Sequence, residues 1–280
     1  MTDQYAVIGN PISHSQSPRI HTMFANQTNQ DMHYTKLLCD VDEFDQTVQN
    51  FIQRGGRGLN VTLPFKQNAF RIATSLSLNA QRTGAVNTLI VKDKQLHGDN
   101  TDGVGLVRDL SNNLKLSLAA ARILVLGAGG AVRGILPNLI DQQPASLTIA
   151  NRTESKAHEL AALFAELFPI QACHFRQLAG SQFDIIINGT SASVDNDLPP
   201  LADGVLQPQG VCYDLMYADS PTPFVRWGLE QEASLSADGI GMLVEQAAES
   251  FYLWRGVRPE TDIVIDTLKP DRLDLAQGIT

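Results

Sequence analysis

Three things are scarce in this sequence: cysteine, net positive charge and long apolar runs. The three cysteines stand far apart and form no C-x-x-C pair: Cys39, Cys173 and Cys212. An odd number of widely spaced cysteines without a C-x-x-C motif suggests neither a disulfide framework nor a metal site, so we expect reduced, mostly core thiols in a cytoplasmic protein. No histidine stands at metal-ligand spacing from a carboxylate cluster, and we therefore predict no metal site.

The charge balance and the hydropathy exclude two further classes of partner. A formal net charge of −9 argues against nucleic acid, because a phosphate backbone needs a basic face. No apolar run approaches the roughly 20 residues that span a bilayer, so no membrane partner is expected. The first four residues also lack the basic start and apolar core of a signal peptide. With 43% apolar and 18% charged residues, the chain is typical of a soluble globular protein of one large domain or two.

A glycine-rich turn between two apolar runs predicts a nucleotide-binding unit. The first run covers 123–126, a helix is expected over 132–141, and the second run covers 147–150. The turn between the first run and the helix consists of Gly127, Ala128, Gly129, Gly130 and Ala131. Strand, turn, helix and strand in about thirty residues are typical of a βαβ unit that binds a dinucleotide. Because Val132 takes the sixth place of G-x-G-x-x-G/A, the glycines alone leave an ordinary strand-to-helix turn open as the alternative.

The residues after the second run favour a phosphorylated cofactor. An NAD site usually has Asp or Glu there, to accept hydrogen bonds from the ribose hydroxyls. Here Asn151, Arg152 and Thr153 follow the strand, and Lys156 comes soon after. An amide beside cations suits a 2′-phosphate, which Arg can bind with two parallel hydrogen bonds. We therefore predict NADP rather than NAD, although Glu154 weakens the local positive field.

The segment before this unit alternates predicted strands and helices. Strands are expected over 5–8, 34–38 and 58–64, helices over 18–26, 41–54, 65–73 and 103–113, and a hairpin of 85–91 with 95–98. Pro18 suits the first helical position and Ser17 the N-cap before it, which leaves Ser15 without a structural role. Lys66 stands where a strand ends and a helix begins, the usual place for chemistry in α/β folds. The polar residues 99–103 indicate either a turn or a hydrogen-bonding wall for a hydroxyl-rich ligand.

The segment after the unit extends the same pattern. Strands are expected over 170–175, 183–188 and 210–214, and helices over 157–167, 222–231 and 242–255. Thr190, Leu215 and Tyr217 follow strand ends, where they would face a cofactor crevice if the sheet is parallel. Gln246 lies off the apolar stripe of the last helix, and the pattern predicts that it is exposed to solvent.

Several motifs, taken in order, resemble the shikimate dehydrogenase family from Gly9 to about Gly256. They are Gly9-Asn10-Pro11 with Ser15 and Ser17, the stretch 60–66, Gly84 to Thr88, Gly98 to Gly103, the turn 127–131, Asn151-Arg152-Thr153, and Gly241-Met242-Leu243 through Gln246. The resemblance implies reversible NADP(H)-dependent reduction of 3-dehydroshikimate to shikimate, on the route through chorismate to aromatic amino acids. Gly189 stands where the family commonly has Ala, and Lys156 where it commonly has Arg.

The resemblance also implies roles for individual residues. Lys66 and Asp102 would form the catalytic pair, with Lys66 stabilising the oxyanion or delivering the proton and Asp102 orienting it. The substrate would contact Ser15, Ser17, Thr62, Asn87, Asp102, Tyr217 and Gln246. NADP would contact Gly127, Ala128, Gly129, Gly130, Ala131, Asn151, Arg152, Thr153, Lys156, Thr190, Leu215 and Gly239. Which member of the pair finally transfers the proton is left open.

We expect an α/β protein of two domains separated by a cleft that closes on its ligands. Residues 1–102, completed by 240–280, would form a substrate-binding and catalytic domain with a mostly parallel sheet, and 103–239 a Rossmann-like NADP domain. Two alternatives stay open: a quinate/shikimate dehydrogenase that uses NAD as well as NADP, and a non-catalytic NADP-binding sensor. The chain could be a monomer or a homodimer. A serine hydrolase is disfavoured because no G-x-S-x-G occurs.

Overall fold

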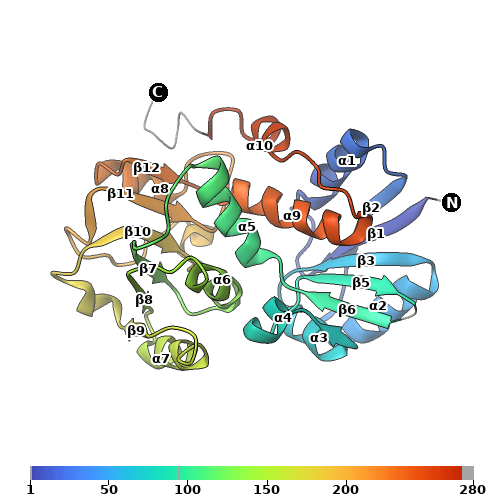
Figure 1. Cartoon of the computed structure of the whole chain (residues 1–280), viewed down its shortest axis with the longest axis horizontal. Coiled ribbons are helices and arrows are strands. Elements are labelled where there is room, and N and C mark those ends of the chain that lie inside the picture. The colour runs from blue at the N-terminus through green and yellow to red at the C-terminus, as the bar shows by residue number, and fades with distance from the viewer. Residues whose placement is uncertain (1, 94, 273–280) are drawn as a thin grey trace. The chain divides into compact units, whose positions relative to one another are not determined.

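Contacts between residues divide the chain into two compact units, and Figure 1 labels the helices and strands. The computed structural model describes residues 2–93 and 95–272. One unit comprises Met1–Gly105 and Val244–Val264, and the other comprises Leu106–Leu243 and Ile265–Thr280. The chain passes between the units within three helices: α5 (Asp102–Arg108), α9 (Ile240–Arg255) and α10 (Asp262–Leu268). Within the described ranges, no helix has the length and apolarity needed to cross a membrane.

The first unit is built on a mixed six-stranded sheet in the order β2-β1-β3-β5-β6-β4. Its strands are β1 (Asp3–Gly9), β2 (Met32–Leu38), β3 (Gly56–Val61), β4 (Ser75–Leu76), β5 (Thr88–Lys92) and β6 (Gln95–Asp99). Strand β5 runs antiparallel to both of its neighbours, whereas the other pairings are parallel. The end of β3, the start of β5 and the end of β6 therefore meet at one edge of the sheet.

Alternation along β1 separates the two faces of this sheet. Ala6 and Ile8 pack into a cluster that includes Phe44 and Phe65, beneath α2 (Phe44–Gln53) and α3 (Lys66–Ile72). Tyr5 and Val7 point to the other face. There, helix α1 (Ser17–Thr28), strand β2 and helix α9 supply a cluster of aromatic rings: His21, Phe24, Tyr34, Phe251 and Trp254. The late segment of the chain that contains α9 thus completes the core that the first segment begins.

The second unit contains a parallel sheet in the order β12-β11-β10-β7-β8-β9. Its strands are β7 (Arg122–Leu126), β8 (Ser146–Ala150), β9 (Ile170–Cys173), β10 (Phe183–Asn188), β11 (Leu206–Asp214) and β12 (Leu235–Ala237). From β7 the chain adds strands first on one side and then on the other, so strand order reverses between β7 and β10. This is the doubly wound arrangement, which binds ligands outside the carboxyl ends of strands at the point of reversal. The predicted α/β fold with a Rossmann-like sheet is confirmed.

Both faces of the second sheet are covered, which explains its unbroken apolar strands. Ile123 and Val125 of β7 pack with α6 (Gly130–Ile140), and Leu124 and Leu126 pack with Phe224 of α8 (Pro223–Glu230). Helix α7 (Glu154–Leu163) packs against β9 and β8. The remaining elements are short: η1 (Val41–Glu43), α4 (Leu78–Thr83), the π-helical segment η2 (Asp109–Asn113), η3 (Phe175–Leu178) and η4 (Ala192–Asp195).

An ion pair is sealed inside the second unit. Arg272 donates to both oxygens of Asp109, and Tyr213 donates its hydroxyl hydrogen to Asp109 Oδ2 at 2.6 Å. The side chains of Arg272 and Asp109 are only 4% and 0% exposed. A Cβ at Gly241 would lie 2.0 Å from Asp109 Oδ1, so glycine is required where the start of α9 passes this carboxylate.

Some expected boundaries differ from the structure. Ser17 is not the N-cap of α1: Gln16 takes that position, and Ser17 is already helical. Strand β3 ends at Val61 rather than Pro64, because the chain turns where Phe65 N donates to Thr62 O at 3.0 Å. By their contacts, 240–243 and 265–272 belong to the second unit, whereas all of 240–280 was expected in the first. Residues 103–105 belong to the first unit, although they were expected in the second. Lys94, in the expected hairpin turn, and 273–280 lie outside the described residues.

Candidate active site and cofactor site

The first unit brings Lys66 and Asp102 together. Lys66 is the first residue of α3, after the end of β3, and Asp102 is the first residue of α5, after the end of β6. Because these ends share one sheet edge, residues far apart in sequence become neighbours. Lys66 Nζ lies 2.5 Å from Asp102 Oδ2, and their side chains are 21% and 10% exposed. The pair is therefore desolvated enough for a strong interaction, yet it remains open to a ligand.

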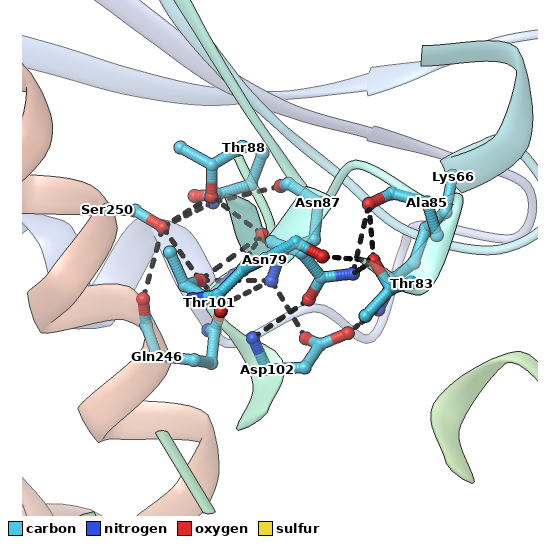
Figure 2. A network of polar contacts seen from close by, with 12 residues as sticks. Lys66, Asn79, Thr83, Ala85, Asn87, Thr88, Thr101, Asp102, Gln246 and Ser250 are labelled. Carbon is cyan, nitrogen blue, oxygen red and sulfur yellow. Dashed lines mark hydrogen bonds and ion pairs between the residues drawn. The ribbon is translucent and has the colours of Figure 1, made fainter. Parts of the chain in front are cut away.

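Asn87 holds the other oxygen of the Asp102 carboxylate. Its amide nitrogen donates to Asp102 Oδ1 at 2.8 Å, and its amide oxygen accepts the backbone N–H of Thr101 at 2.9 Å. The backbone N–H of Asp102 donates to Asn100 Oδ1 at 3.1 Å, which fixes the turn into α5. Figure 2 shows Asn87 and Lys66 converging on Asp102. The two oxygens of the carboxylate thus have different partners.

Gln246 reaches the same network from α9. Its Oε1 lies 3.4 Å from Thr101 Oγ1 and 3.5 Å from Asn87 Nδ2 (Figure 2). The expectation that Gln246 is exposed is wrong, because the residue is half-buried. Its position off the apolar stripe reflects a polar face of α9 that packs against the polar edge of the sheet.

The loop after β1, the start of α1 and the loop after β3 carry the other predicted substrate residues of the first unit. Ser15 Oγ donates to Ser17 Oγ at 3.2 Å and accepts the backbone N–H of Ser17 at 3.3 Å. Thr62 N donates to Ile8 O at 3.0 Å. A Cβ at Gly9 would lie 2.4 Å from Thr62 Cγ2, so the glycine lets the two loops lie against each other. The structure thereby gathers hydroxyl groups at the edge that carries Lys66.

The glycine turn of the second unit has the form that a dinucleotide site requires. Gly127 has φ +101°, a left-handed conformation that favours glycine, and its amide donates to Ala150 O at 2.8 Å. Gly129 and Gly130 are exposed, and a Cβ on either would meet nothing within 4 Å. The open N-terminus of α6 therefore presents backbone N–H groups and the positive end of the helix dipole, which suit a pyrophosphate.

The end of β8 carries the predicted 2′-phosphate residues. The Asn151 side chain donates to Thr153 O at 2.8 Å, and Arg152, Thr153 and Lys156 are exposed. The residue directly after the strand is a neutral amide, whereas a carboxylate in its place would repel a phosphate. The Gly127 turn and this strand end therefore fit NADP in both charge and shape.

A buried carboxylate organises the loops at the ends of β10 and β11. Asp214 accepts hydrogen bonds from Asn188 Nδ2 and Met216 N, both at 3.1 Å, and from the hydroxyls of Ser193 and Thr222, both at 2.7 Å. Burial raises the pKa of the Asp214 carboxyl. By linking the loops after β10 and β11, Asp214 fixes the part of the carboxyl edge of the sheet on which Thr190, Leu215 and Tyr217 stand.

Of the remaining predicted residues of the second unit, Thr190, Leu215 and Tyr217 stand on those loops, and Gly239 follows β12. Thr190 donates its hydroxyl hydrogen to Asn188 Oδ1 at 2.8 Å. A Cβ at Gly239 would lie 2.4 Å from Leu215 O, so the backbone must pass closely there. Tyr217 is half-buried, and burial raises the pKa of its phenol.

Five polar residues are buried behind Asp102, and the sequence singled out only Thr101 among them, in the polar segment 99–103: His21, Asn60, Thr88, Thr101 and Ser250. All five are at most 6% exposed. One signal was available, because a polar residue inside an otherwise apolar strand needs a partner when it is buried. Asn60 in β3 and Thr88 in β5 are residues of this kind.

Comparisons with known proteins agree along the chain. Residues 7–89 match the family model described as the shikimate dehydrogenase substrate binding domain, residues 109–195 match shikimate / quinate 5-dehydrogenase, and residues 239–269 match the shikimate 5'-dehydrogenase C-terminal domain. The shikimate dehydrogenase (NADP(+)) of Cellvibrio japonicus is 57% identical over 270 residues, which cover 96% of this chain and 98% of that protein.

Solved structures share the fold over nearly the whole chain. An Ael1 enzyme from Pseudomonas putida has a TM-score of 0.88 and 45% identity, over 95% of this chain and 98% of that one. The shikimate 5-dehydrogenase of Thermus thermophilus, in complex with NADP(H) and shikimate, has a TM-score of 0.86 and 28% identity, over 96% and 99%. This chain belongs to the shikimate dehydrogenase family.

Proposed function

We propose that the protein catalyses the reversible NADP(H)-dependent reduction of 3-dehydroshikimate to shikimate, a step towards chorismate and the aromatic amino acids. It is an oxidoreductase acting on a CH–OH group. The observation that carries this proposal is the Lys66–Asp102 pair at 2.5 Å, on the sheet edge that also gathers the hydroxyls of Ser15, Ser17 and Thr62. A carbonyl that accepts hydride needs a proton donor at its oxygen, and an ammonium oriented by a carboxylate supplies one.

In this proposal, Lys66 and Asp102 have different roles at the carbonyl oxygen. NADPH, when bound, supplies the hydride. The Lys66 ammonium stabilises the negative charge that develops on the oxygen and can hand over a proton. The Asp102 carboxylate keeps that ammonium in place, and its partial exposure lets it share a proton with the substrate hydroxyl in the reverse direction. Asn87 prevents the carboxylate from rotating away from Lys66.

The polar groups around this pair suit a ring that carries a carboxylate and several hydroxyls. We assign Ser15, Ser17 and Thr62 to one side of the substrate and Asn87 and Gln246 to another, because hydroxyls and amides can both donate to and accept from alcohols. Tyr217, from the second unit, is assigned as a further contact on the family resemblance alone.

The cofactor is assigned to the second unit. The backbone of Gly127, Ala128, Gly129, Gly130 and Ala131 receives the pyrophosphate, and Asn151, Arg152, Thr153 and Lys156 receive the adenosine 2′-phosphate. Thr190 and Leu215, on the loops that Asp214 fixes, and Gly239, after β12, complete the contacts. The first unit is accordingly the substrate-binding and catalytic domain, and the second is the NADP domain.

We also propose a cytoplasmic location, for which the free thiols of Cys39, Cys173 and Cys212 are suited. The monomer and the homodimer both remain compatible with the proposed reaction, since each residue assigned above comes from one chain.

A spectrophotometric assay tests the proposed function. Shikimate and quinate are each supplied with NADP and with NAD, and the absorbance of the reduced cofactor is followed at 340 nm. We expect shikimate with NADP to give the highest kcat/KM. Comparable rates with quinate or NAD would favour the dual-specificity enzyme, and the absence of any shikimate-dependent change would favour a non-catalytic NADP-binding protein.

A further inference from the structure

A line of buried polar side chains runs through the first unit to Asp102. Its members, from the far end, are Asn60, Ser250, Thr88, Asn87 and Asp102, and we refer to them as the Asn60–Asp102 chain. Asn60 Nδ2 lies 3.0 Å from Ser250 Oγ, which lies 2.7 Å from Thr88 Oγ1. Thr88 Oγ1 lies 2.9 Å from Asn87 Oδ1, and Asn87 Nδ2 lies 2.8 Å from Asp102 Oδ1. Figure 2 shows Ser250 pointing from α9 towards Thr88, which in turn lies beside Asn87.

The direction of each hydrogen bond follows from counting donors. The Asn87 amide oxygen accepts from the backbone N–H of Thr101, so the amide nitrogen must face Asp102. Because an amide oxygen cannot donate, Thr88 must give its one hydroxyl hydrogen to Asn87. At the 2.7 Å contact between Thr88 and Ser250, the hydrogen must then come from Ser250. The alternative acceptors for Ser250, the Gln246 carbonyl at 3.1 Å and Thr101 Oγ1 at 3.3 Å, are both farther away.

The direction of the hydrogen bonds at the Asn60 end of the Asn60–Asp102 chain can be determined in the same way. Asn60 Nδ2 faces the backbone carbonyl of Asn87 at 3.3 Å, which can only accept, so this atom is the nitrogen of the amide. Asn60 Oδ1 accepts the Tyr34 hydroxyl hydrogen at 2.7 Å and faces His21 Nε2 at 3.2 Å. Every donor in the chain therefore points towards the Asp102 carboxylate. Hydrogen bonds aligned in this way polarise one another, and burial strengthens them.

We propose that Thr88 and Ser250 are positioning residues for the reaction at Lys66 and Asp102. They set the orientation of the Asn87 amide, and that amide holds Asp102 Oδ1, which leaves Oδ2 for Lys66. Both residues are 0% exposed, so they act through Asn87 and not on the substrate. This inference rests on the proposed function and extends it to two residues that lie behind the site.

The test compares variants that remove or keep the aligned hydrogen. Thr88→Val keeps the shape of the side chain but donates nothing, whereas Thr88→Ser keeps the donor. Ser250→Ala removes the preceding donor and provides a second variant should Thr88→Val fold poorly. Matched controls come from the second unit, where Thr148→Val and Ser236→Ala remove buried hydroxyls that bond Gln171 Oε1 and Val225 O. Each protein is assayed for kcat and for the KM of shikimate and NADP, with urea unfolding alongside.

We expect Thr88→Val and Ser250→Ala to lower kcat about threefold to tenfold, the worth of one buried hydrogen bond, with the KM for NADP unchanged. Thr88→Ser should restore kcat to within about twofold of the wild-type value, and both controls should keep it. If Thr88 and Ser250 had only a structural role, their loss would lower the urea midpoint. It would not lower kcat while leaving the KM for NADP unchanged, and Thr88→Ser would not restore kcat.

Two results would overturn the inference. One is wild-type kcat in both Thr88→Val and Ser250→Ala; the other is an equal loss of kcat in the two control variants. Neither result would contradict the proposed function, which is tested separately by the shikimate-dependent rate of the wild-type protein.

Discussion

Two aspartates, Asp102 and Asp109, each begin a helical segment and each pair with a cation, but their surroundings differ. Asp102 opens α5 in the first unit and meets Lys66, while Asp109 opens the π-helical segment in the second unit and meets Arg272. The first pair remains 21% and 10% exposed, and the second is 4% and 0% exposed. One pair can reach a ligand, and the other is sealed.

The choice of cation matches this difference. Arg272 binds both oxygens of Asp109, and Tyr213 adds a further donor, so the sealed carboxylate is saturated by a rigid, permanently charged group and a phenol. Lys66 bonds one oxygen of Asp102 through a flexible stem, and its ammonium can give up a proton. The exposure and the donor geometry of a buried ion pair, rather than its charges, therefore indicate whether it can react. Substitution of either cation would test this distinction.

Replacing Lys66 should affect turnover far more than stability. We expect Lys66→Ala to lower kcat by roughly 10²–10⁴, because proton transfer and oxyanion stabilisation are both lost, while the KM for shikimate changes little. Steady-state kinetics at 340 nm measure this effect. Turnover at the wild-type rate would remove Lys66 from the proposed mechanism.

Replacing Arg272 should affect stability far more than turnover. Arg272→Ala leaves the Asp109 carboxylate buried without its counter-charge, and the free energy of unfolding should fall by about 3–5 kcal/mol. Urea denaturation measures this loss, and kcat per folded molecule should stay near the wild-type value. If Arg272→Ala lost turnover while keeping its urea midpoint, the division between a reactive pair and a structural pair would be wrong.

The cofactor preference should depend on Arg152. Arg152→Ala removes a charge-assisted contact to the 2′-phosphate, so the KM for NADPH should rise about tenfold to a hundredfold, with little change for NADH. Initial rates with each cofactor give the comparison. Equal changes for both cofactors would mean that the phosphate is held elsewhere.

We expect His21 to make the stability of the folded protein depend on pH. Burial lowers the pKa of this imidazole to about 3, against an ordinary value of 6.5. Between these two values the unfolded chain binds a proton that the folded chain does not, so stability is full above pH 6.5 and falls as pH falls towards 3. The physical cause is that a proton on His21 Nδ1, which has no hydrogen-bond partner among the described residues, would be buried unpaired.

Comparison with a variant isolates that contribution. His21→Gln keeps an amide donor for Asn60 but cannot titrate. The free energy of unfolding of the wild type should fall more steeply than that of the variant below pH 6.5, by up to about 1.4 kcal/mol per pH unit. Parallel curves from urea unfolding at several pH values would contradict the assignment of a neutral, buried His21.

Much of the fold was predictable because its signals are local. The family predicted from the motifs is confirmed, and so is the α/β architecture. The glycine turn is an example: the conformation of Gly127 and the open space at Gly129 follow from the residue types alone. Helix boundaries were less certain, as the N-cap of α1 shows, because Gln16 and Ser17 compete for one position.

The site was predictable only in part. Lys66 and Asp102 stand at element ends, where α/β folds place chemistry, and the structure brings them together. Thr88 is a polar residue in an apolar strand and so signals that it needs a partner, but Ser250 gave no signal, and the pairing of the two depends on how α9 packs on the sheet. A serine among the apolar residues of a helix looks like an ordinary core position until the strand opposite it is known. The roles assigned to the site residues stay predictions until the variants are measured.

The place of Arg272 in the sequence has a consequence for shortened forms of the protein. A reading frame that ends after Asp271 differs by one residue from a frame that ends after Arg272. The shorter product lacks Arg272 and leaves the Asp109 carboxylate buried without its counter-charge. A stop codon before Arg272 should therefore give a chain that is degraded in the cell, although the change touches no reacting atom.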